Sequence, residues 1–316
     1  MNVDGLVSNF GALTTTGLTI GAIYALVALG YTLVYGVLKL INFAHSEVFI
    51  SGAFAALWTW QLLGLDQNSA VSGLWAIVLY LLVGLIVAAL ASALVAALVE
   101  QVAYRPLRRR NAPPLAFLIT AIGASITLAE AFGVFTDRVS KGVPKVVPTD
   151  PLFTIAGAEI DAVQLLVIGA ALVMMIGLDQ IVNRSRVGRG IRAVAQDPNT
   201  AALMGINKDR IILIVFIVGG LMAGAAGVLY NVRIGAVVYH AGFLLGLKAF
   251  TAAVLGGIGN LRGALLGGLL LGLTENYAAG LWGNEWKDLV AFVVLVVLLM
   301  FRPTGLLGES LGKARA

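Results

Sequence analysis

Long apolar runs alternate along the chain with short polar stretches. A run of about 20 apolar residues is enough to cross the roughly 30 Å hydrocarbon core of a bilayer as an α-helix. The runs predicted to do so are 11–38, 43–63, 74–99, 114–135, 161–183, 211–231, 244–260, 263–282 and 287–301. The pattern therefore predicts an all-α, polytopic integral membrane protein with about eight to nine transmembrane helices.

The run 244–260 differs from the others. It is short, it contains Lys248, and it ends in the glycine-rich stretch Gly256-Gly257-Ile258-Gly259. Glycines at this density favour a break in a helix, and broken helices occur at membrane depth where they line protein instead of lipid. The segment is predicted either to cross the membrane or to form a broken or re-entrant helix.

The two longest polar stretches have different characters. Residues 137–160 contain Pro144, Pro148 and Pro151 and are expected to form an external loop without long regular structure. Residues 184–210 carry small apolar residues at helical spacing, interrupted at Asp197-Pro198. This second stretch is predicted to form one or two short helices with an apolar patch, the alternative being a solvated basic loop that only sets topology.

Composition and charge support the membrane assignment. The chain is 59% hydrophobic and 12% charged, against roughly 25% charged in a soluble domain, which excludes an ordinary soluble enzyme. The net charge of +5 comes from basic residues in short loops between the apolar runs, so no nucleic-acid partner is expected. The Lys/Arg bias predicts that the N-terminus lies outside and that 184–210 and the C-terminus lie in the cytoplasm.

Catalytic chemistry is poorly represented in the sequence. The chain has no cysteine, no G-x-x-x-x-G-K-[ST] phosphate loop, and only two histidines, His45 and His240, in separate segments. The adjacent His45, Ser46 and Glu47 cannot form a triad with one another, because neighbouring side chains on a helix point about 100° apart. We therefore expect no enzyme activity, no ATPase site and no metal or cofactor in this chain.

Ionisable residues inside the apolar runs are candidates for function, since burying a charge in a membrane is costly. Lys248 and Glu275 are the deepest, and each has a structural alternative: Glu275 can be held by a neighbouring helix, and Lys248 can extend to the membrane surface. Glu100 and Asp179, at span ends beside Arg105 and Arg184, are expected to form surface pairs.

Two asparagines stand at interruptions of the apolar pattern. Asn42 precedes His45 and Glu47 at the polar start of the second run, where it is predicted to cap the helix, and Asn260 follows the glycine-rich stretch. The similar layout of these two places is consistent with an internal repeat of broken helices, as in many transporters, or with chance.

Several strings in order resemble the LivH-type permease subunits of branched-chain amino-acid ABC importers. They extend over residues 30–305, nearly the whole chain. The strings are Gly30-Tyr31-Thr32-Leu33-Val34-Tyr35-Gly36, Ile41-Asn42-Phe43-Ala44-His45, Val102-Ala103-Tyr104-Arg105-Pro106-Leu107-Arg108, Arg192-Ala193-Val194-Ala195-Gln196-Asp197, Ala201-Ala202-Leu203-Met204-Gly205-Ile206-Asn207, Lys248-Ala249-Phe250-Thr251-Ala252-Ala253-Val254-Leu255-Gly256-Gly257-Ile258-Gly259 and Pro303-Thr304-Gly305.

This resemblance implies a role and a set of partners. Residues 1–316 would form one permease domain, working in the bacterial inner membrane with a homologous LivM-type permease, two cytoplasmic ATPases that bind ATP and Mg²⁺, and an extracytoplasmic amino-acid-binding protein. Alternating access would move an aqueous cavity from one face to the other. The residues expected to line that cavity are Asn42, His45, Glu47, Lys248, Asn260 and Glu275.

The resemblance also implies that 184–210 is the segment that docks on an ATPase. The residues expected to make that contact are Arg192, Gln196, Asp197, Ala201, Ala202, Met204, Gly205 and Ile206. The stretch departs from the importer pattern E-A-A-x-x-x-G, because it lacks the Glu and places Gly205 one residue early.

The sequence leaves the substrate open within this class. Leucine, isoleucine and valine, other amino acids, and urea or short amides are all compatible with it, since the binding protein does most of the selection. Two further classes are an ATP-independent channel or secondary transporter, which has no need of an apolar cytoplasmic patch, and a structural subunit, in which Lys248 and Glu275 would be dispensable.

Overall fold

A computed structural model describes residues 3–155 and 157–308 of the chain. Its helices are α1 Val3–Ser8, α2 Phe10–Leu38, α3 His45–Leu62, α4 Leu74–Val99, α5 Arg105–Arg109, α6 Pro114–Phe135, α7 Ala162–Arg184, α8 Arg186–Gln196, α9 Pro198–Leu203, α10 Lys208–Ile234, α11 Ala241–Gly256, α12 Leu261–Trp282 and α13 Lys287–Phe301. A π-helical turn, Glu100–Tyr104, joins α4 to α5. The mostly helical architecture confirms the helical part of the prediction, and the C-terminal residues 309–316, predicted to be cytoplasmic, lie outside the described residues.

Two small antiparallel sheets correct the all-α expectation. Strand β1, Lys141–Gly142, pairs with β4, Ala236–Val237. Strands β2, Pro151–Ile155, and β3, Ala158–Asp161, form a hairpin within the predicted irregular loop 137–160. The hairpin forms because the backbone groups of β2 and β3 pair with each other. Pro151 is compatible with this pairing because it is the first residue of its strand.

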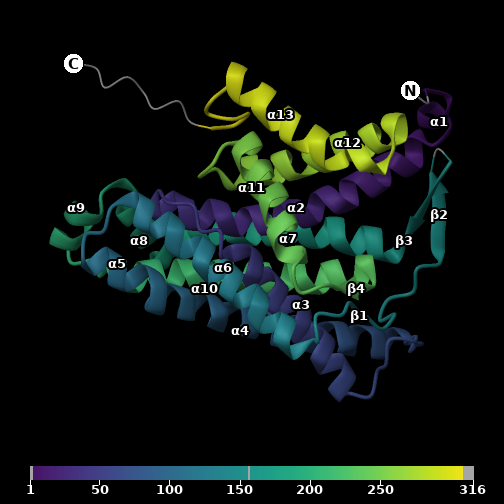
Figure 1. Ribbon diagram of the computed structural model, residues 1–316, viewed down its shortest axis with the longest axis horizontal. Coiled ribbons are helices and arrows are strands. Elements are labelled where there is room, and N and C mark those ends of the chain that lie inside the picture. Colours follow the sequence, from purple (N-terminus) through teal and green to yellow (C-terminus); the bar gives the residue numbers. More distant parts are fainter. Residues whose placement is uncertain (1–2, 156, 309–316) are drawn as a thin grey trace.

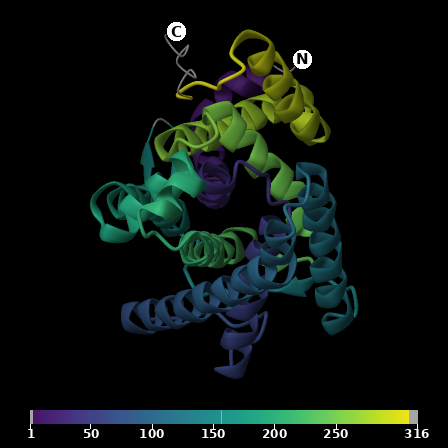
Figure 2. The same cartoon turned by 90° about the vertical axis from the view of Figure 1, so that its left-hand side faces the viewer.

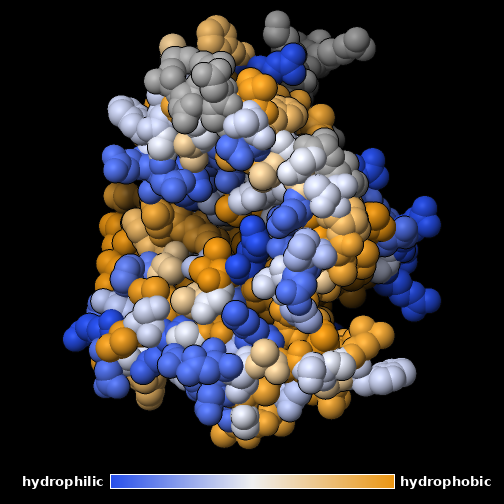
Figure 3. Space-filling view, turned by 90° about the vertical axis from the view of Figure 1, so that its right-hand side faces the viewer, coloured by the Kyte–Doolittle hydropathy of each residue, from blue (hydrophilic) through white to orange (hydrophobic). Residues whose placement is uncertain are grey.

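The short elements gather at the two ends of the helical bundle. Figure 1 shows α5, α8 and α9 together at one end and the four strands together at the other. Figure 3, which faces the strand end, shows hydrophilic side chains spread over it, with hydrophobic side chains on the flanks. The long helices therefore run between the end that carries α5, α8 and α9 and a strand end with a largely hydrophilic surface.

The number of membrane crossings is only partly determined by helix length and composition. Within residues 3–155 and 157–308, five helical segments are long and apolar enough to cross a membrane: α2, the continuous Leu74–Arg109, α6, α7 and α10. The pair α11 and α12 also qualifies as a unit but is bent by 119° between its two helices, which raises the number to six. Helix α13 has only 15 residues, so the expected count of eight to nine stays a prediction.

Helix α2 lies in the middle of the bundle and packs against α12, α10, α11 and α7 (Figure 2). A Cβ added to Gly21 of α2 would lie 2.6 Å from the Gly268 carbonyl oxygen of α12. One added to Gly272 would lie 2.3 Å from the Gly17 carbonyl oxygen. Glycines at four-residue spacing on both helices thus let the two backbones approach closely, as small residues do in membrane proteins.

The predicted break at the end of run 244–260 is present. Gly257 and Gly259 adopt φ of +108° and +99°, and α12 restarts at Leu261 in a new direction. The backbone N–H groups of Leu306 and Leu307 donate to the carbonyl groups of Leu255 and Gly256, each at 2.9 Å. The segment after α13 therefore binds the end of α11 at the break through backbone hydrogen bonds.

Candidate functional site

The start of α3 carries a buried polar cluster. His45 packs edge-on against Tyr31 of α2, with ring centroids 5.0 Å apart. Glu47 is completely buried and receives two long hydrogen bonds, from the Ser46 hydroxyl at 3.5 Å and the Ser125 hydroxyl of α6 at 3.4 Å. Within the described part of the chain, His45 Nε2 and Glu47 Oε2 are buried without a hydrogen-bond partner, and no Lys or Arg forms an ion pair with Glu47.

Asn42 lies beside this cluster but has a different role from the predicted one. Helix α3 begins at His45 with Ala44 at its cap position and no side-chain cap, so the prediction that Asn42 caps it is wrong. The Asn42 side chain is buried and accepts a hydrogen bond of 3.1 Å from the Tyr104 hydroxyl. Tyr104 ends the π-helical turn Glu100–Tyr104, and insertions of this kind in helices are frequent at functional sites.

Lys248 and Glu275 meet in a second cluster. The Lys248 ammonium lies 3.2 Å from Glu275 Oε1 and 2.6 Å from Asp288 Oδ1. The Tyr24 hydroxyl donates to Glu275 Oε2 at 2.9 Å and lies 3.4 Å from the ammonium. This four-residue charged cluster ties α11, α12, α13 and α2 together, which is the structural alternative that the sequence left open for Glu275.

Asn260 is a helix cap. Its side-chain oxygen accepts from the backbone N–H groups of Arg262 at 3.0 Å and Gly263 at 3.1 Å, and its amide donates to the Leu307 carbonyl at 2.8 Å. The asparagine therefore starts α12 and fixes the segment after α13 to the break, a task that Asn42 does not perform for α3.

The structure thus separates the six predicted pathway residues into three groups. His45 and Glu47 with Asn42 lie around the start of α3, Lys248 with Glu275 forms the charged cluster, and Asn260 lies at the break. Sequence reasoning missed four partners of these residues: Tyr24, Tyr104, Ser125 and Asp288. A tyrosine or serine inside an apolar run, such as Tyr24 or Ser125, is a weak signal, because hydroxyl groups are common in helices and their partners come from distant segments.

Helix α8, in the predicted coupling segment, packs tightly on the bundle. Ile191 and Val194 are buried, while Gln196 at the last turn is exposed. The Arg192 guanidinium donates to the Val182 carbonyl near the end of α7. Because α8 also contacts α2 and α10, it is attached to three long helices of the bundle.

The predicted interruption at Asp197-Pro198 is confirmed as the junction of α8 and α9. Asp197 caps α9, accepting from the Asn199 backbone N–H at 2.9 Å and from the Thr200 hydroxyl. The Thr200 hydrogen bond, followed by the backbone donors, holds the pKa of the fully exposed Asp197 carboxyl below its usual value. The two short helices are thus joined by a capped turn.

The end of α9 exposes an apolar surface that differs from the predicted patch. Ala201 faces inward and is buried, which removes it from the surface. Leu203 is 88% exposed and Met204 is 79% exposed. We call the exposed residues Ala202, Leu203, Met204 and Gly205 the α9 tip, with the half-buried Ile206 directly after it. Leu203 is the residue that the sequence analysis missed here.

The predicted surface pairs of Glu100 and Asp179 are wrong in their partners. Glu100 is buried and pairs with Arg108 at 2.8 Å, one helical turn beyond the adjoining arginine. Asp179 of α7 pairs with Arg262 of α12 at 3.2 Å, so this ion pair joins two helices. Tertiary packing overrides the nearest arginine for Asp179, whereas Glu100 pairs within its own continuous helical segment, Leu74–Arg109.

Comparison with known proteins finds relatives that share one description. The family model described as the branched-chain amino acid transport system / permease component matches residues 13–299. The permease protein BraD of the high-affinity branched-chain amino acid transport system of Pseudomonas aeruginosa is 42% identical over 93% of this chain and 94% of its own. The corresponding LivH protein of Escherichia coli is 39% identical, with the same coverage.

One solved structure, PsaBC from Streptococcus pneumoniae in complex with Fab, superposes at a TM-score of 0.48 and 13% identity over 96% of this chain and 95% of the other. A similarity of that size does not assign a fold.

Proposed function

The chain belongs to the family of branched-chain amino acid transport system permease components, and we propose that it is the permease subunit of an ATP-driven importer of leucine, isoleucine and valine. The observation that carries this proposal is the family match over residues 13–299, together with relatives of 42% and 39% identity along nearly the whole chain. The multi-pass apolar helices agree with a permease of the cell membrane.

The importer that we propose contains further subunits. They are a homologous second permease of the LivM type, two ATPases that bind ATP and Mg²⁺, and an extracytoplasmic amino-acid-binding protein. The chain itself acts as one transport domain without an ATPase site. These assignments rest on its membership of a permease family.

The proposed orientation places the α5, α8 and α9 end in the cytoplasm and the strand end outside. Arg105, Arg108 and Arg109 of α5 and four arginines of α7 and α8 lie toward the first end. Since basic loops stay on the cytoplasmic side, this supports an outside N-terminus and a cytoplasmic C-terminus. Termini on opposite sides require an odd number of crossings, which selects nine from the predicted eight to nine.

Helices α8 and α9, within residues 184–210, are the proposed coupling segment. The α9 tip offers exposed Leu203 and Met204 to an ATPase surface, whereas an ATP-independent channel has no use for an apolar surface there. Since α8 contacts α2, α7 and α10, a displacement of the tip on ATP binding would tilt those helices and open the cavity on the other face.

The proposed pathway runs past the cluster at the start of α3. Among the residues that the structure describes, His45 Nε2 and Glu47 Oε2 are buried polar atoms without hydrogen-bond partners, and such atoms are stabilised when a polar substrate or water reaches them. They lie where α2, α3, α6 and α11 meet. The charged cluster and Asn260 border this region as positioning elements.

The proposal is tested with the complex of permeases and ATPases, reconstituted together with its cognate binding protein. ATPase activity is measured with leucine, isoleucine and valine, with polar amino acids and with urea. Stimulation by the branched-chain ligands supports the proposal. Stimulation only by urea or by another amino acid would keep the importer but assign it that compound as its substrate. ATPase activity that no ligand affects, or a complex without any ATPase, would overturn the importer.

A variant pair tests the coupling segment in the same assay. Met204→Arg places a charge on the α9 tip and is expected to abolish stimulation. Leu62→Arg, at an equally exposed position at the end of α3, is the matched control and should preserve it. Met204 is preferable to Gly205, whose φ of +83° would strain any side chain. Equal stimulation in both variants would place the docking surface elsewhere.

A further inference from the structure

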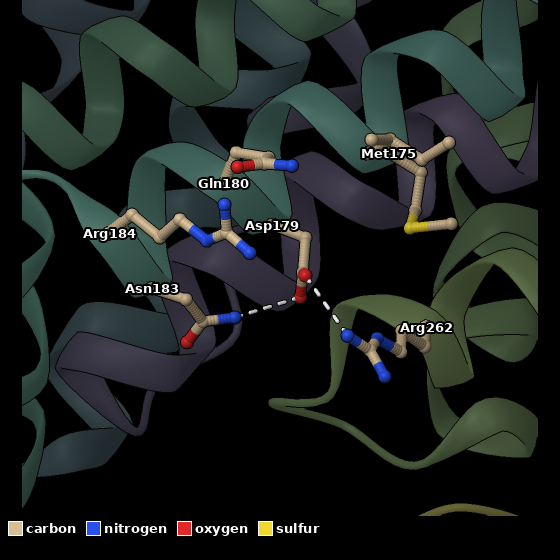
Figure 4. A pocket seen from close by; sticks show the side chains of 7 residues that line it. Met175, Asp179, Gln180, Asn183, Arg184 and Arg262 are labelled. Carbon is tan, nitrogen blue, oxygen red and sulfur yellow. Dashed lines mark hydrogen bonds and ion pairs between the residues drawn. The ribbon is translucent and has the colours of Figure 1, made fainter.

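A cleft opens between α7 and α12, at the end of the bundle that carries α8 and α9. Its volume is about 350 Å³. The residues that line it are Met175, Ile176, Asp179, Gln180, Asn183, Arg184 and Arg262 (Figure 4). None of them belongs to the proposed pathway or to the α9 tip, so the function proposed above does not account for this cleft.

The polar wall of the cleft has an excess of positive charge. Asp179 accepts from Asn183 at 2.9 Å and from Arg262 at 3.2 Å, so the single carboxylate is already engaged. Arg262 uses one terminal nitrogen for this contact and remains largely exposed. Arg184 forms no ion pair with any described residue. The cleft thus contains two guanidinium groups, those of Arg184 and Arg262, and one carboxylate, that of Asp179. Because each guanidinium carries five N–H donors, donors remain available toward the cleft.

Both helices change from polar to apolar along the faces that meet at the cleft. On α7, Asn183 and Asp179 are followed toward the middle of the helix by Ile176 and Leu172, at spacings of three to four residues that keep them on one face. On α12, Arg262 is followed in the same way by Leu266 and Leu270. These four apolar side chains are exposed.

The cleft-facing side of α7 is long enough to contact a headgroup and part of an acyl chain. Leu172, in the apolar part of this face, and Arg184, at its polar end, are 12 positions apart, which corresponds to about 18 Å along the helix axis. Arg184 is the last residue of α7, a helix long and apolar enough to cross a membrane, and Arg262 lies in the first turn of α12. With these helix ends at the level of the lipid headgroups, the leucines would lie within the hydrocarbon region. Charge and hydrophobicity therefore change at the depth where a phospholipid changes from headgroup to acyl chain.

We propose that this cleft binds an anionic phospholipid, with its phosphate diester between Arg184 and Arg262 and an acyl chain along the apolar faces of α7 and α12. Guanidinium groups match phosphate geometry through paired N–H donors, and basic pockets between membrane helices on the cytoplasmic side bind anionic headgroups. Asp179 holds Arg262 across the cleft in the position that the phosphate requires. A free phosphate ion would use the same arginines but not the apolar faces.

Lipid retention by the full-length protein tests the site. The chain, purified with the subunits that accompany it, is exchanged into detergent with phosphatidylglycerol or phosphatidylcholine, and bound lipid is counted by native mass spectrometry. We expect phosphatidylglycerol to be retained in preference, and Arg184→Gln to weaken its binding about fivefold, the effect of one basic residue at a membrane surface. Arg110→Gln, an exposed arginine outside the cleft, is the matched control and should bind as the wild type does.

Three outcomes would overturn the proposal. They are equal retention of both lipids, equal loss in Arg184→Gln and Arg110→Gln, and protection against thermal unfolding by inorganic phosphate as strong as that by phosphatidylglycerol. Met175→Trp gives a second check that leaves both arginines in place, because the larger side chain fills the cleft. It should displace the lipid while the protein still elutes as a single folded species, and lipid retained at the wild-type level would place the binding site elsewhere.

Discussion

Glu47 and Glu275 are two fully buried carboxylates with opposite surroundings. Glu275 lies 3.2 Å from the Lys248 ammonium and accepts a 2.9 Å hydrogen bond from Tyr24. Glu47 has only two hydroxyl donors, at 3.4 and 3.5 Å, and one of its oxygen atoms has no partner among the described residues. The same side chain is therefore compensated in one region and left uncompensated in the other.

We expect this difference in surroundings to separate a structural role from a functional one. A buried carboxylate with a cation and a hydroxyl donor can hold helices together, and breaking such a pair is strongly destabilising. A carboxylate without a cation contributes little to the stability of the fold, and its presence inside a membrane protein makes it a candidate for a role in transport. On this ground we expect Glu275 to matter first for stability and Glu47 first for translocation.

Removal of Lys248 should have the largest effect on stability. Lys248→Ala leaves Glu275 buried without its cation, and we expect a loss of about 3–5 kcal/mol in the free energy of unfolding. Thermal and denaturant unfolding of the purified protein measure it. The double variant Lys248→Met/Glu275→Leu removes both charges and should recover most of the loss. A double variant as unstable as the single one would show that the ion pair is not the cause.

A methyl group at Gly242 should have the next largest effect. An added Cβ would lie 2.6 Å from Glu47 Oε2 and 2.8 Å from Ile50 Cγ1, so the Glu47 carboxylate has to move within a packed region. Overpacking of this kind costs about 1–3 kcal/mol. Gly123→Ala, at a helical position with nothing within 4 Å, is the control and should be neutral or slightly stabilising. Equal stability of the two variants would contradict the tight packing around Glu47.

Glu47→Gln should separate stability from transport. The amide has nearly the same shape and carries no charge, so we expect the free energy of unfolding to change by less than about 1 kcal/mol. Uptake of leucine by proteoliposomes should fall at least about tenfold, which corresponds to about 1.4 kcal/mol in the barrier. Normal uptake with normal expression would remove Glu47 from the pathway.

Asp288→Asn should have the smallest effect. The Asp288 side chain is 50% exposed although it lies 2.6 Å from the Lys248 ammonium, and exposed ion pairs contribute about 0–1 kcal/mol. The loss in the free energy of unfolding is compared with that of Lys248→Ala in the same assay. The comparison shows how much of the stabilisation by Lys248 depends on Asp288 and how much on Glu275. A loss as large as that of Lys248→Ala would mean that Asp288, and not Glu275, is the partner on which the cluster depends.

Sequence reasoning succeeded where a local pattern carries the information. The apolar runs, the junction at Asp197-Pro198 and the break after Gly256 all depend on residues close in the chain. It failed where partners come from distant segments: Asn42 pairs with Tyr104 and not with its own helix, Asp179 pairs with Arg262, and Ala201 turns inward. Helical periodicity cannot decide which of several faces of a short helix such as α9 meets the bundle.

The amino-acid sequence alone determined the class of this protein. The apolar runs predicted a polytopic helical membrane protein, because hydrophobicity acts locally on each segment, and the ordered strings over residues 30–305 resembled a permease family. The tertiary structure decided which polar residues meet. Lys248 and Glu275, 27 positions apart, form one cluster with Tyr24, whereas Glu47 has no cationic partner in the part of the chain that the structure describes. Such pairings depend on how helices cross and rotate, and close packing of glycine-bearing faces such as those of α2 and α12 sets that geometry.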